Sequence, residues 1–282
     1  MPIYLKKEEV EFTVHKAILS KRSMGLVPTM GSLHHGHLSL IEKANKENDI
    51  VWVSIFINPT QFNDPNDLSR YPKNLEKDYG LIKNICEKIK IFSPNEKEIY
   101  GKTPTLQKYD FKKIDVELEG KHRKNHFNGV ATIVSKLLTL IKPNKVYFGE
   151  KDYQQTQIIK KLICLENINV NMIICPTVRE KNGLALSSRN NFLSNIDRGN
   201  SSIIYKSLNL LKSNFNNSNL KSLRKNIIND INKKKNFKVE YLEIANAETL
   251  QIDEKINPKK QYRAFICVRV NEVRLIDNIL LN

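Results

Sequence analysis

The stretch VPTMGSLHHGHLSLI, residues 27–41, begins as an apolar strand and ends as an amphipathic helix. Between the two lies a short turn that contains two glycines and three histidines. In an open α/β sheet such a turn joins the carboxyl end of a strand to the positive end of a helix, where anionic ligands bind. Gly31 and Gly36 would let backbone N–H groups approach an anion closely. The turn therefore predicts a site for an anionic ligand.

Apolar runs with little alternation continue this pattern along the chain to about residue 178. They occupy residues 23–29, 49–58, 90–94, 145–149 and 170–177. Such runs are typical of parallel strands that are covered on both faces. Helical patterns separate them, and residues 129–141 place their apolar side chains on one stripe. The order predicts an α/β fold, a Rossmann-like doubly wound parallel sheet in a domain spanning residues 1–178.

The pattern changes after residues 186–194. A helical stretch near 198–212 leads into a segment rich in Asn and Ser, residues 212–226, which is typical of a surface connection. Strand patterns follow at 239–250, 261–270 and 272–281. We expect a smaller C-terminal α+β domain over residues 179–282, closing over the active site.

Composition and charge limit the possible functions. The chain has 282 residues, of which 40% are hydrophobic, so a sizeable core can form. The formal net charge is +16, but the lysine excess is spread along the chain and does not form the patch expected of a nucleic-acid-binding surface. Such a charge favours small anionic substrates. No stretch approaches the roughly 18 apolar residues of a membrane span, and no signal peptide is evident, so we expect a cytoplasmic protein without a membrane partner.

Cysteines and common phosphate motifs give little sign of a metal or nucleotide site. The four cysteines are scattered and form no C-x-x-C pair, so they predict buried thiols and no metal site. Neither a Walker A pattern nor G-x-G-x-x-G occurs. His34 and His37 are three residues apart, which predicts that both imidazoles lie on one face of the first helical turn and donate hydrogen bonds to phosphate oxygens. His35 is expected to point elsewhere, and nothing near these histidines supplies a third metal ligand.

The pattern T-x-G-x-x-H-x-G-H resembles the signature of the HxGH nucleotidyltransferases. Within that group the whole chain resembles the pantoate–β-alanine ligases, or pantothenate synthetases. The segments that carry the resemblance appear in the family's order and spacing: residues 27–41, VSIFINPTQFNDPNDLSRYP (53–72), HFNGVATIVSKLL (126–138), FGEKDYQQ (148–155), PTVRE (176–180) and LALSSRN (184–190). LEIANAETL and VRLIDN continue it near the C-terminus.

The resemblance implies a ligase of coenzyme A biosynthesis that works in two steps. ATP and (R)-pantoate form pantoyl adenylate and pyrophosphate with Mg²⁺ present, and β-alanine then displaces AMP to give pantothenate. It also implies a homodimer. Mg²⁺ is expected on the ATP phosphates, with no protein ligand named.

The resemblance further implies the residues of the site. His37, His34 and Lys151 are the catalytic candidates, with His37 the family's proton donor; physically, a hydrogen bond that stabilises the leaving phosphate is the more plausible role. Gln61, Gln155 and Asn58 are candidates for binding pantoate and β-alanine, because a neutral amide can both donate and accept. ATP contacts are expected from Met30, Gly31, Ser32, Leu33, His34, His35, Gly36, His37, Gly149, Glu150, Lys151, Asp152, Val178, Leu186, Ser187, Ser188 and Arg189.

Three other functions stay open from the residues. The first is another HxGH adenylyltransferase, which would not need the Gln61 and Gln155 pair. The second is a synthetase fragment that binds tRNA, which would need a clustered basic face. The third is a non-catalytic nucleic-acid-binding protein, which would show a steep salt dependence of affinity. The chain also departs from the family where Lys124 and Asn125 replace a frequent Pro-Gly pair.

Overall fold

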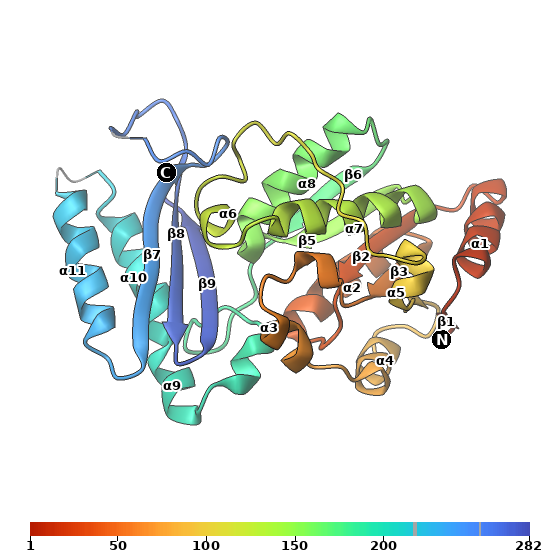
Figure 1. Ribbon diagram of the computed structural model, residues 1–282, viewed down its shortest axis with the longest axis horizontal. Coiled ribbons are helices and arrows are strands. Elements are labelled where there is room, and N and C mark those ends of the chain that lie inside the picture. Colours follow the sequence, from red (N-terminus) through yellow and green to blue (C-terminus); the bar gives the residue numbers. More distant parts are fainter. Residues whose placement is uncertain (217–218, 254) are drawn as a thin grey trace. The chain divides into compact units, whose positions relative to one another are not determined.

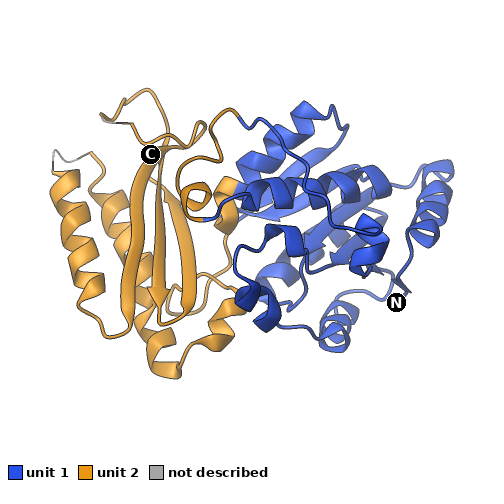
Figure 2. Cartoon of the chain, viewed as in Figure 1, with its two compact units in different colours: residues 1–111, 123–150, 155–176 blue, residues 112–122, 151–154, 177–282 orange. Residues whose placement is uncertain are grey.

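The computed structural model describes residues 1–216, 219–253 and 255–282. The chain divides into two compact units, coloured blue and orange in Figure 2. Unit 1 comprises residues 1–111, 123–150 and 155–176, and unit 2 comprises residues 112–122, 151–154 and 177–282. The last boundary, 176/177, lies next to the predicted one at 178/179. Segments 112–122 and 151–154, expected in the first domain, group with unit 2 instead.

Unit 1 alternates strands and helices along most of its length (Figure 1). Its strands are β1 (Ile3–Tyr4), β2 (Met24–Thr29), β3 (Ile50–Ile55), β4 (Lys90–Phe92), β5 (Lys145–Gly149) and β6 (Asn171–Cys175). Its helices are α1 (Lys7–Leu19), α2 (His35–Glu47), η1 (Pro59–Gln61), α3 (Pro65–Arg70), α4 (Leu75–Lys83), α5 (Glu96–Tyr100) and α7 (His126–Ile141). Two further helices, η2 (Glu150–Asp152) and α8 (Tyr153–Leu165), include residues of both units.

The six strands of unit 1 form one parallel sheet in the order β1-β4-β3-β2-β5-β6. From the central strand β2 the chain adds β3 and β4 on one side, and it then returns to add β5 and β6 on the other. This confirms the predicted doubly wound sheet. The carboxyl ends of β2 and β5 flank the topological switch point, which is where sheets of this type bind their ligands.

The sheet is apolar on both faces because helices cover each of them. Val27 and Val53 pack with Ile41 of α2 in one core cluster. Leu26 and Trp52 precede them by one residue and so point to the opposite face, where both are completely buried. Right-handed crossovers that run in opposite directions from β2 put α2 and α7 on opposite faces. This double cover explains the near absence of alternation in the strand sequences.

Unit 2 is built on an antiparallel sheet in the order β7-β8-β9, formed by β7 (Phe237–Asn246), β8 (Tyr262–Val270) and β9 (Val273–Leu280). Helices α10 (Ser202–Ser213) and α11 (Leu220–Asn232) pack on one face of it. On the other face, Leu118 and Tyr153 pack with Phe265. This apolar contact is why segments 112–122 and 151–154 group with unit 2. The short helices α6 (Glu119–His122), η3 (Ser188–Phe192) and α9 (Asn195–Asn200) complete the unit.

The predicted surface connection over residues 212–226 is wrong in its second half, because α11 begins at Leu220. Leu220, Leu223 and Ile227 are spaced at helical intervals and pack against the core of unit 2. Asn and Lys residues around them hid this stripe in a segment of polar composition. Residues 217 and 218 of the predicted connection lie outside the described part of the chain.

Candidate active site

The turn between β2 and α2 is held in an unusual backbone conformation. Gly31 and Ser32 both have positive φ angles, +77° and +51° respectively. The hydroxyl of Thr29 accepts a hydrogen bond from the Gly31 N–H at 3.1 Å and donates one to the Ser54 carbonyl of β3 at 2.7 Å. A Cβ atom at residue 31 would lie only 3.0 Å from the Ile55 side chain, so glycine is required by space as well as by φ.

A carboxylate from helix α4 holds the next two residues of the turn. Asp78 accepts hydrogen bonds from the N–H groups of Ser32 and Leu33, each at 2.8 Å. Its side chain is buried, at 2% exposure. Asp78 was not among the residues predicted from the sequence. The available signal was its position on the apolar stripe of α4 with Leu75 and Ile82, which a charged residue occupies only for a reason.

The N–H groups of both glycines form hydrogen bonds within the turn. Gly31 donates to Thr29, and Gly36 donates to the Nδ1 atom of His34 at 3.1 Å. In this structure side chains of the turn accept the hydrogen bonds of both amides, and a contact of either amide with an anion stays a prediction. The imidazoles are the groups of this turn that suit phosphate recognition.

The two outer histidines lie together at the start of α2. His34 is the N-cap of α2, and its ring centroid lies 4.1 Å from that of His37. Because Nδ1 of His34 accepts the Gly36 hydrogen bond, the neutral ring carries its proton on Nε2 and is a donor there. His35 is exposed, as expected. The H-x-G-H spacing thus brings two imidazoles to one point at the carboxyl edge of the sheet.

Asn58 is surrounded by partners within unit 1. Its amide nitrogen donates to the Gly129 carbonyl at 3.0 Å and to Oε1 of Gln61 at 3.3 Å. Its amide oxygen accepts from the hydroxyls of Tyr100 at 2.5 Å and Thr60 at 3.0 Å. Both polar atoms of this buried side chain are thus engaged, and one of its partners is the Gln61 amide. A direct contact of Asn58 with pantoate stays a prediction.

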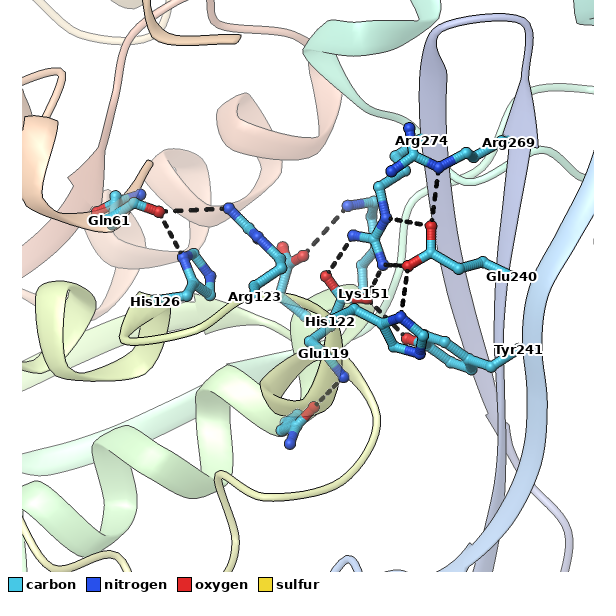
Figure 3. Close-up of polar contacts among 12 residues, drawn as sticks. Gln61, Glu119, His122, Arg123, His126, Lys151, Glu240, Tyr241, Arg269 and Arg274 are labelled. Atoms are coloured by element: carbon cyan, nitrogen blue, oxygen red, sulfur yellow. Dashed lines mark hydrogen bonds and ion pairs between the residues drawn. The ribbon is translucent and has the colours of Figure 1, made fainter. Parts of the chain in front are cut away.

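Gln61 lies beside the histidine turn. Its Nε2 atom lies 2.9 Å from the Met30 sulfur, so the structure brings two predicted parts of the site together within unit 1. The backbone carbonyl oxygen of Gln61 is contacted by the His126 ring at 2.8 Å and by the Arg123 guanidinium at 3.5 Å, and both side chains point at it in Figure 3. The side chain is buried, at 8% exposure. Its amide oxygen faces Asn58 and its amide nitrogen faces Met30.

The second group of predicted residues follows strand β5. Gly149 ends this strand and Glu150 follows it, at the same edge of the sheet as the histidine turn. Gln155 lies in the first turn of α8 and is half-buried. In unit 2, the Lys151 ammonium lies 3.2 Å from the Asp152 carboxylate, and the Lys151 carbonyl accepts from Asn278 at 2.8 Å.

The remaining predicted residues form a loop of unit 2. The Val178 carbonyl accepts from the Leu186 N–H at 3.0 Å, and the Ser187 side chain caps η3, which begins with Ser188 and Arg189. This loop therefore brings all the predicted residues between 178 and 189 together. Arg179 anchors the loop through a bidentate pair with buried Asp277, at 2.6 and 2.9 Å. No role was predicted for this pair from the sequence.

A further charged cluster fixes α6 on the sheet of unit 2 (Figure 3). Arg274 of β9 binds both oxygens of Glu119 at 2.8 Å and also binds Glu240 of β7 at 2.8 and 2.9 Å. Tyr241 donates to Glu119 at 2.8 Å, and His122 lies 3.1 Å from Glu240. Burial acts to raise the pKa of Glu240, but the hydrogen bonds and charge of Arg274 outweigh it and lower the pKa. No local pattern in the sequence signals this cluster.

The described residues lack a cluster of metal ligands and a membrane-spanning helix. Among residues 1–216, 219–253 and 255–282, no group of three His, Cys, Asp or Glu side chains could hold a metal ion. Within the same ranges, every helix is too short or too polar to cross a lipid bilayer.

Known proteins resemble this chain along its whole length. Residues 3–280 match the family described as pantoate-beta-alanine ligase. The pantothenate synthetase of Christiangramia forsetii is 44% identical over 282 residues, which cover 100% of both chains. The pantoate–beta-alanine ligase of Dictyostelium discoideum is 42% identical, and the alignment covers 99% of this chain and 97% of the relative.

Solved structures also superpose on this chain over almost its whole length. Pantothenate synthetase from Thermus thermophilus superposes with a TM-score of 0.88 at 33% identity, covering 100% of this chain and 99% of that one. Pantoate-beta-alanine ligase from Francisella tularensis, complexed with beta-gamma ATP and beta-alanine, superposes with a TM-score of 0.80 at 39% identity. That comparison covers 99% of this chain and 97% of the other.

Proposed function

The chain belongs to the pantoate–β-alanine ligase family, and from this membership we propose that it makes pantothenate through a pantoyl adenylate. A carboxylate oxygen of (R)-pantoate attacks the α-phosphorus of Mg-ATP; a P–O bond forms and the bond to pyrophosphate breaks. The amine of β-alanine then attacks the activated acyl carbon. An amide bond forms, the amine releases a proton, and AMP leaves.

The observation that carries this proposal is the position of Gln61 beside the histidine turn. Its Nε2 atom lies 2.9 Å from Met30, at the turn that brings His34 and His37 together. An acyl substrate held by Gln61 would thus lie next to the groups that hold ATP. Holding two reactants side by side supplies much of the catalysis in reactions that lack a covalent nucleophile.

The histidines act on the phosphates as hydrogen-bond donors. The neutral His34 ring presents an N–H at Nε2, because its Nδ1 atom accepts from Gly36. We assign His34 and His37 to the α-phosphate and the departing pyrophosphate, where negative charge increases during the first step. Neither side chain needs to transfer a proton for this role.

The other nucleotide contacts are assigned from the family resemblance. Lys151 would offer a point charge and Asp152 an acceptor for ribose hydroxyls. Ser187, Ser188 and Arg189 would contact the terminal phosphates through hydroxyl groups and a guanidinium group. Val178 is assigned to the adenine through its backbone. Gln155, in unit 1, is assigned with Gln61 to pantoate, whose hydroxyls and carboxylate suit neutral amides.

Magnesium is proposed to enter as part of the ATP substrate. The described residues offer no cluster of three metal-ligating side chains, and the carboxylate next to the histidine turn, Asp78, already accepts two backbone hydrogen bonds. These observations favour a cation held by phosphate oxygens. The family resemblance also leads us to propose a cytoplasmic homodimer, which light scattering can test.

Full-length family membership argues against the three other functions considered from the sequence. A shorter adenylyltransferase or a tRNA-binding fragment would not match this family over residues 3–280. A nucleic-acid-binding protein would not need the pairing of Gln61 with the histidine turn. None of the contacts described above favours any of the three.

The test is to measure the two half-reactions separately. Pyrophosphate release from Mg-ATP should require pantoate, and the formation of AMP and pantothenate should require β-alanine. His37→Ala should slow pyrophosphate release by roughly 10²–10³-fold, as for the loss of one oxyanion donor. His15→Ala, at an exposed position of α1, is the matched control and should match the wild type. A folded wild type without pantoate-dependent release would refute the proposal.

A further inference from the structure

One buried carboxylate of unit 1 has no part in the chemistry described so far. Asp78 lies on α4, 46 positions from Ser32 in the sequence, and both of its oxygens accept from consecutive N–H groups of the histidine turn. The two distances, each 2.8 Å, are those of charge-assisted hydrogen bonds. Asp78 therefore contacts the turn through its backbone, whatever side chains the turn carries.

The turn needs such a support because its backbone is strained. Ser32 has a φ angle of +51°, a conformation that costs a residue with a Cβ atom roughly 1 kcal/mol or more. The hydrogen bond from the Ser32 N–H to Asp78 offsets this cost and selects the left-handed conformation. At Gly31 an added Cβ would lie 2.9 Å from Oδ2 of Asp78, so the carboxylate and the turn also fit each other in shape.

Fold stability is a poor explanation for a carboxylate at this position. Asp78 is 2% exposed, among Leu33, Ile55 and Ile82 of the core. Burial raises the pKa of Asp78, although the N–H groups of Leu33 and Ser32 and the charge of Lys77 act in the opposite direction. A folded-state pKa above the unfolded value means that ionisation of this group weakens the fold. A carboxylate retained at such a cost is typical of a functional site.

We propose that Asp78 is a positioning residue for the adenylation step, because it fixes the turn that places Met30 and the two histidines. The inference rests on the proposed function, in which this turn contacts ATP. Both oxygens of Asp78 are engaged by the turn, so the residue acts through the backbone of the turn. With the turn held, Met30 stays against Gln61 at 2.9 Å and His34 stays at the N-cap of α2. Without the carboxylate, the turn has lost the acceptor of two consecutive N–H groups and relaxes to other conformations.

The test compares Asp78→Asn with a matched variant at the other end of the sheet. Asp49 also accepts hydrogen bonds from a turn, the N–H and hydroxyl of Ser23 at 2.8 and 2.7 Å, where β2 and β3 begin. Asp49→Asn is therefore the control for a lost turn contact away from the histidines. Asp78→Asn should bind Mg-ATP roughly 10- to 100-fold more weakly, as expected when charged hydrogen bonds are lost. Asp49→Asn should bind ATP like the wild type.

A rescue experiment separates positioning from general damage to the fold. Ser32→Gly removes the Cβ atom that makes the positive φ costly, so Asp78→Asn/Ser32→Gly should recover part of the ATP affinity relative to Asp78→Asn. Ser32→Gly alone gives the reference for the lost hydroxyl. The double variant also serves as the assay protein if Asp78→Asn alone does not fold.

The outcomes are distinct. Weaker ATP binding by folded Asp78→Asn with recovery in the double variant supports the proposal. ATP affinity within twofold of the wild type, an equal loss in Asp49→Asn, or no recovery would overturn it. If the wild type binds ATP but releases no pyrophosphate with pantoate, the proposed function fails. The direct ATP-binding comparison still decides the role of Asp78 in that case.

Discussion

Replacing Gly129 with alanine should damage pantoate binding through a steric contact between α7 and η1. Gly129 lies in α7, and a Cβ atom there would stand 2.4 Å from the Thr60 carbonyl oxygen and 2.8 Å from the Cα atom of Gln61. Ordinary contacts between a carbon and a carbonyl oxygen begin at about 3.3 Å. The backbone of η1 would have to withdraw by roughly 1 Å, and it would carry Gln61 with it.

The size of the effect follows from that displacement. A misplacement of about 1 Å can cost roughly 100-fold in rate, which corresponds to about 2.7 kcal/mol of transition-state stabilisation. The same movement strains the hydrogen bond from Asn58 to the Gly129 carbonyl, which now measures 3.0 Å. We therefore expect kcat/KM for pantoate to fall roughly 100-fold in Gly129→Ala. Overpacking should cost about 1–3 kcal/mol of stability, partly offset by the better helix propensity of alanine.

The assay is pantoate-dependent pyrophosphate release at saturating ATP, together with urea unfolding. Gly80→Ala is the matched control, because Gly80 also lies in a helix, α4, but an added Cβ would meet no atom within 4 Å. That variant should keep wild-type kinetics and gain up to about 1 kcal/mol of stability. A Gly129→Ala protein with unchanged pantoate kinetics and a similar gain would refute the steric argument.

Two further predictions concern stability. Arg274→Ala leaves the carboxylates of Glu119 and Glu240 without their shared cation. The free energy of unfolding, measured in urea, should fall by roughly 3–5 kcal/mol. A loss below about 1 kcal/mol would contradict this prediction. Hydrogen bonds lower the pKa of Glu47 to about 2 from its usual 4.5, and the bond from Lys43 contributes most. Because the folded-state pKa is lowered, Glu47 stabilises the fold above pH 4.5, and that contribution disappears as the pH falls toward 2. The difference in urea midpoint between about pH 7 and pH 3 should therefore be smaller in Glu47→Gln than in the wild type, and an equal difference would count against the lowered pKa.

Local sequence patterns were sufficient for the architecture and for the pairing of the two histidines. The apolar runs at 23–29, 49–58 and 145–149 predicted buried parallel strands, and they contain β2, β3 and β5. The H-x-G-H spacing predicted adjacent imidazoles, which the 4.1 Å ring distance confirms. These features were predictable because strand and helix periodicity, and the geometry of a single turn, depend on residues that are close in sequence.

Contacts between distant parts of the chain could not be predicted in this way. The place of Asp78 on the apolar stripe of α4 marks it as unusual, but its partners in the histidine turn are known only once α4 packs against that turn. The hydrogen bonds that Asn58 makes with Tyr100 and Gly129 join segments about 40 and 70 residues apart, and no local pattern indicates them. Segment 112–122 was predicted to belong to the first domain, but Leu118 packs on the sheet of unit 2.

The order of amino acids was thus enough to establish the doubly wound sheet, the histidine turn and the family. The folded chain was needed to show that Asp78 accepts hydrogen bonds from the turn, that Asn58 donates one to Gln61, and that the N–H groups of Gly31 and Gly36 are bonded within the turn. This division arises because the free energy of a buried polar group depends on which partners folding brings within hydrogen-bond distance. Those partners come from elements far apart in the chain, so the local periodicity of the sequence does not identify them.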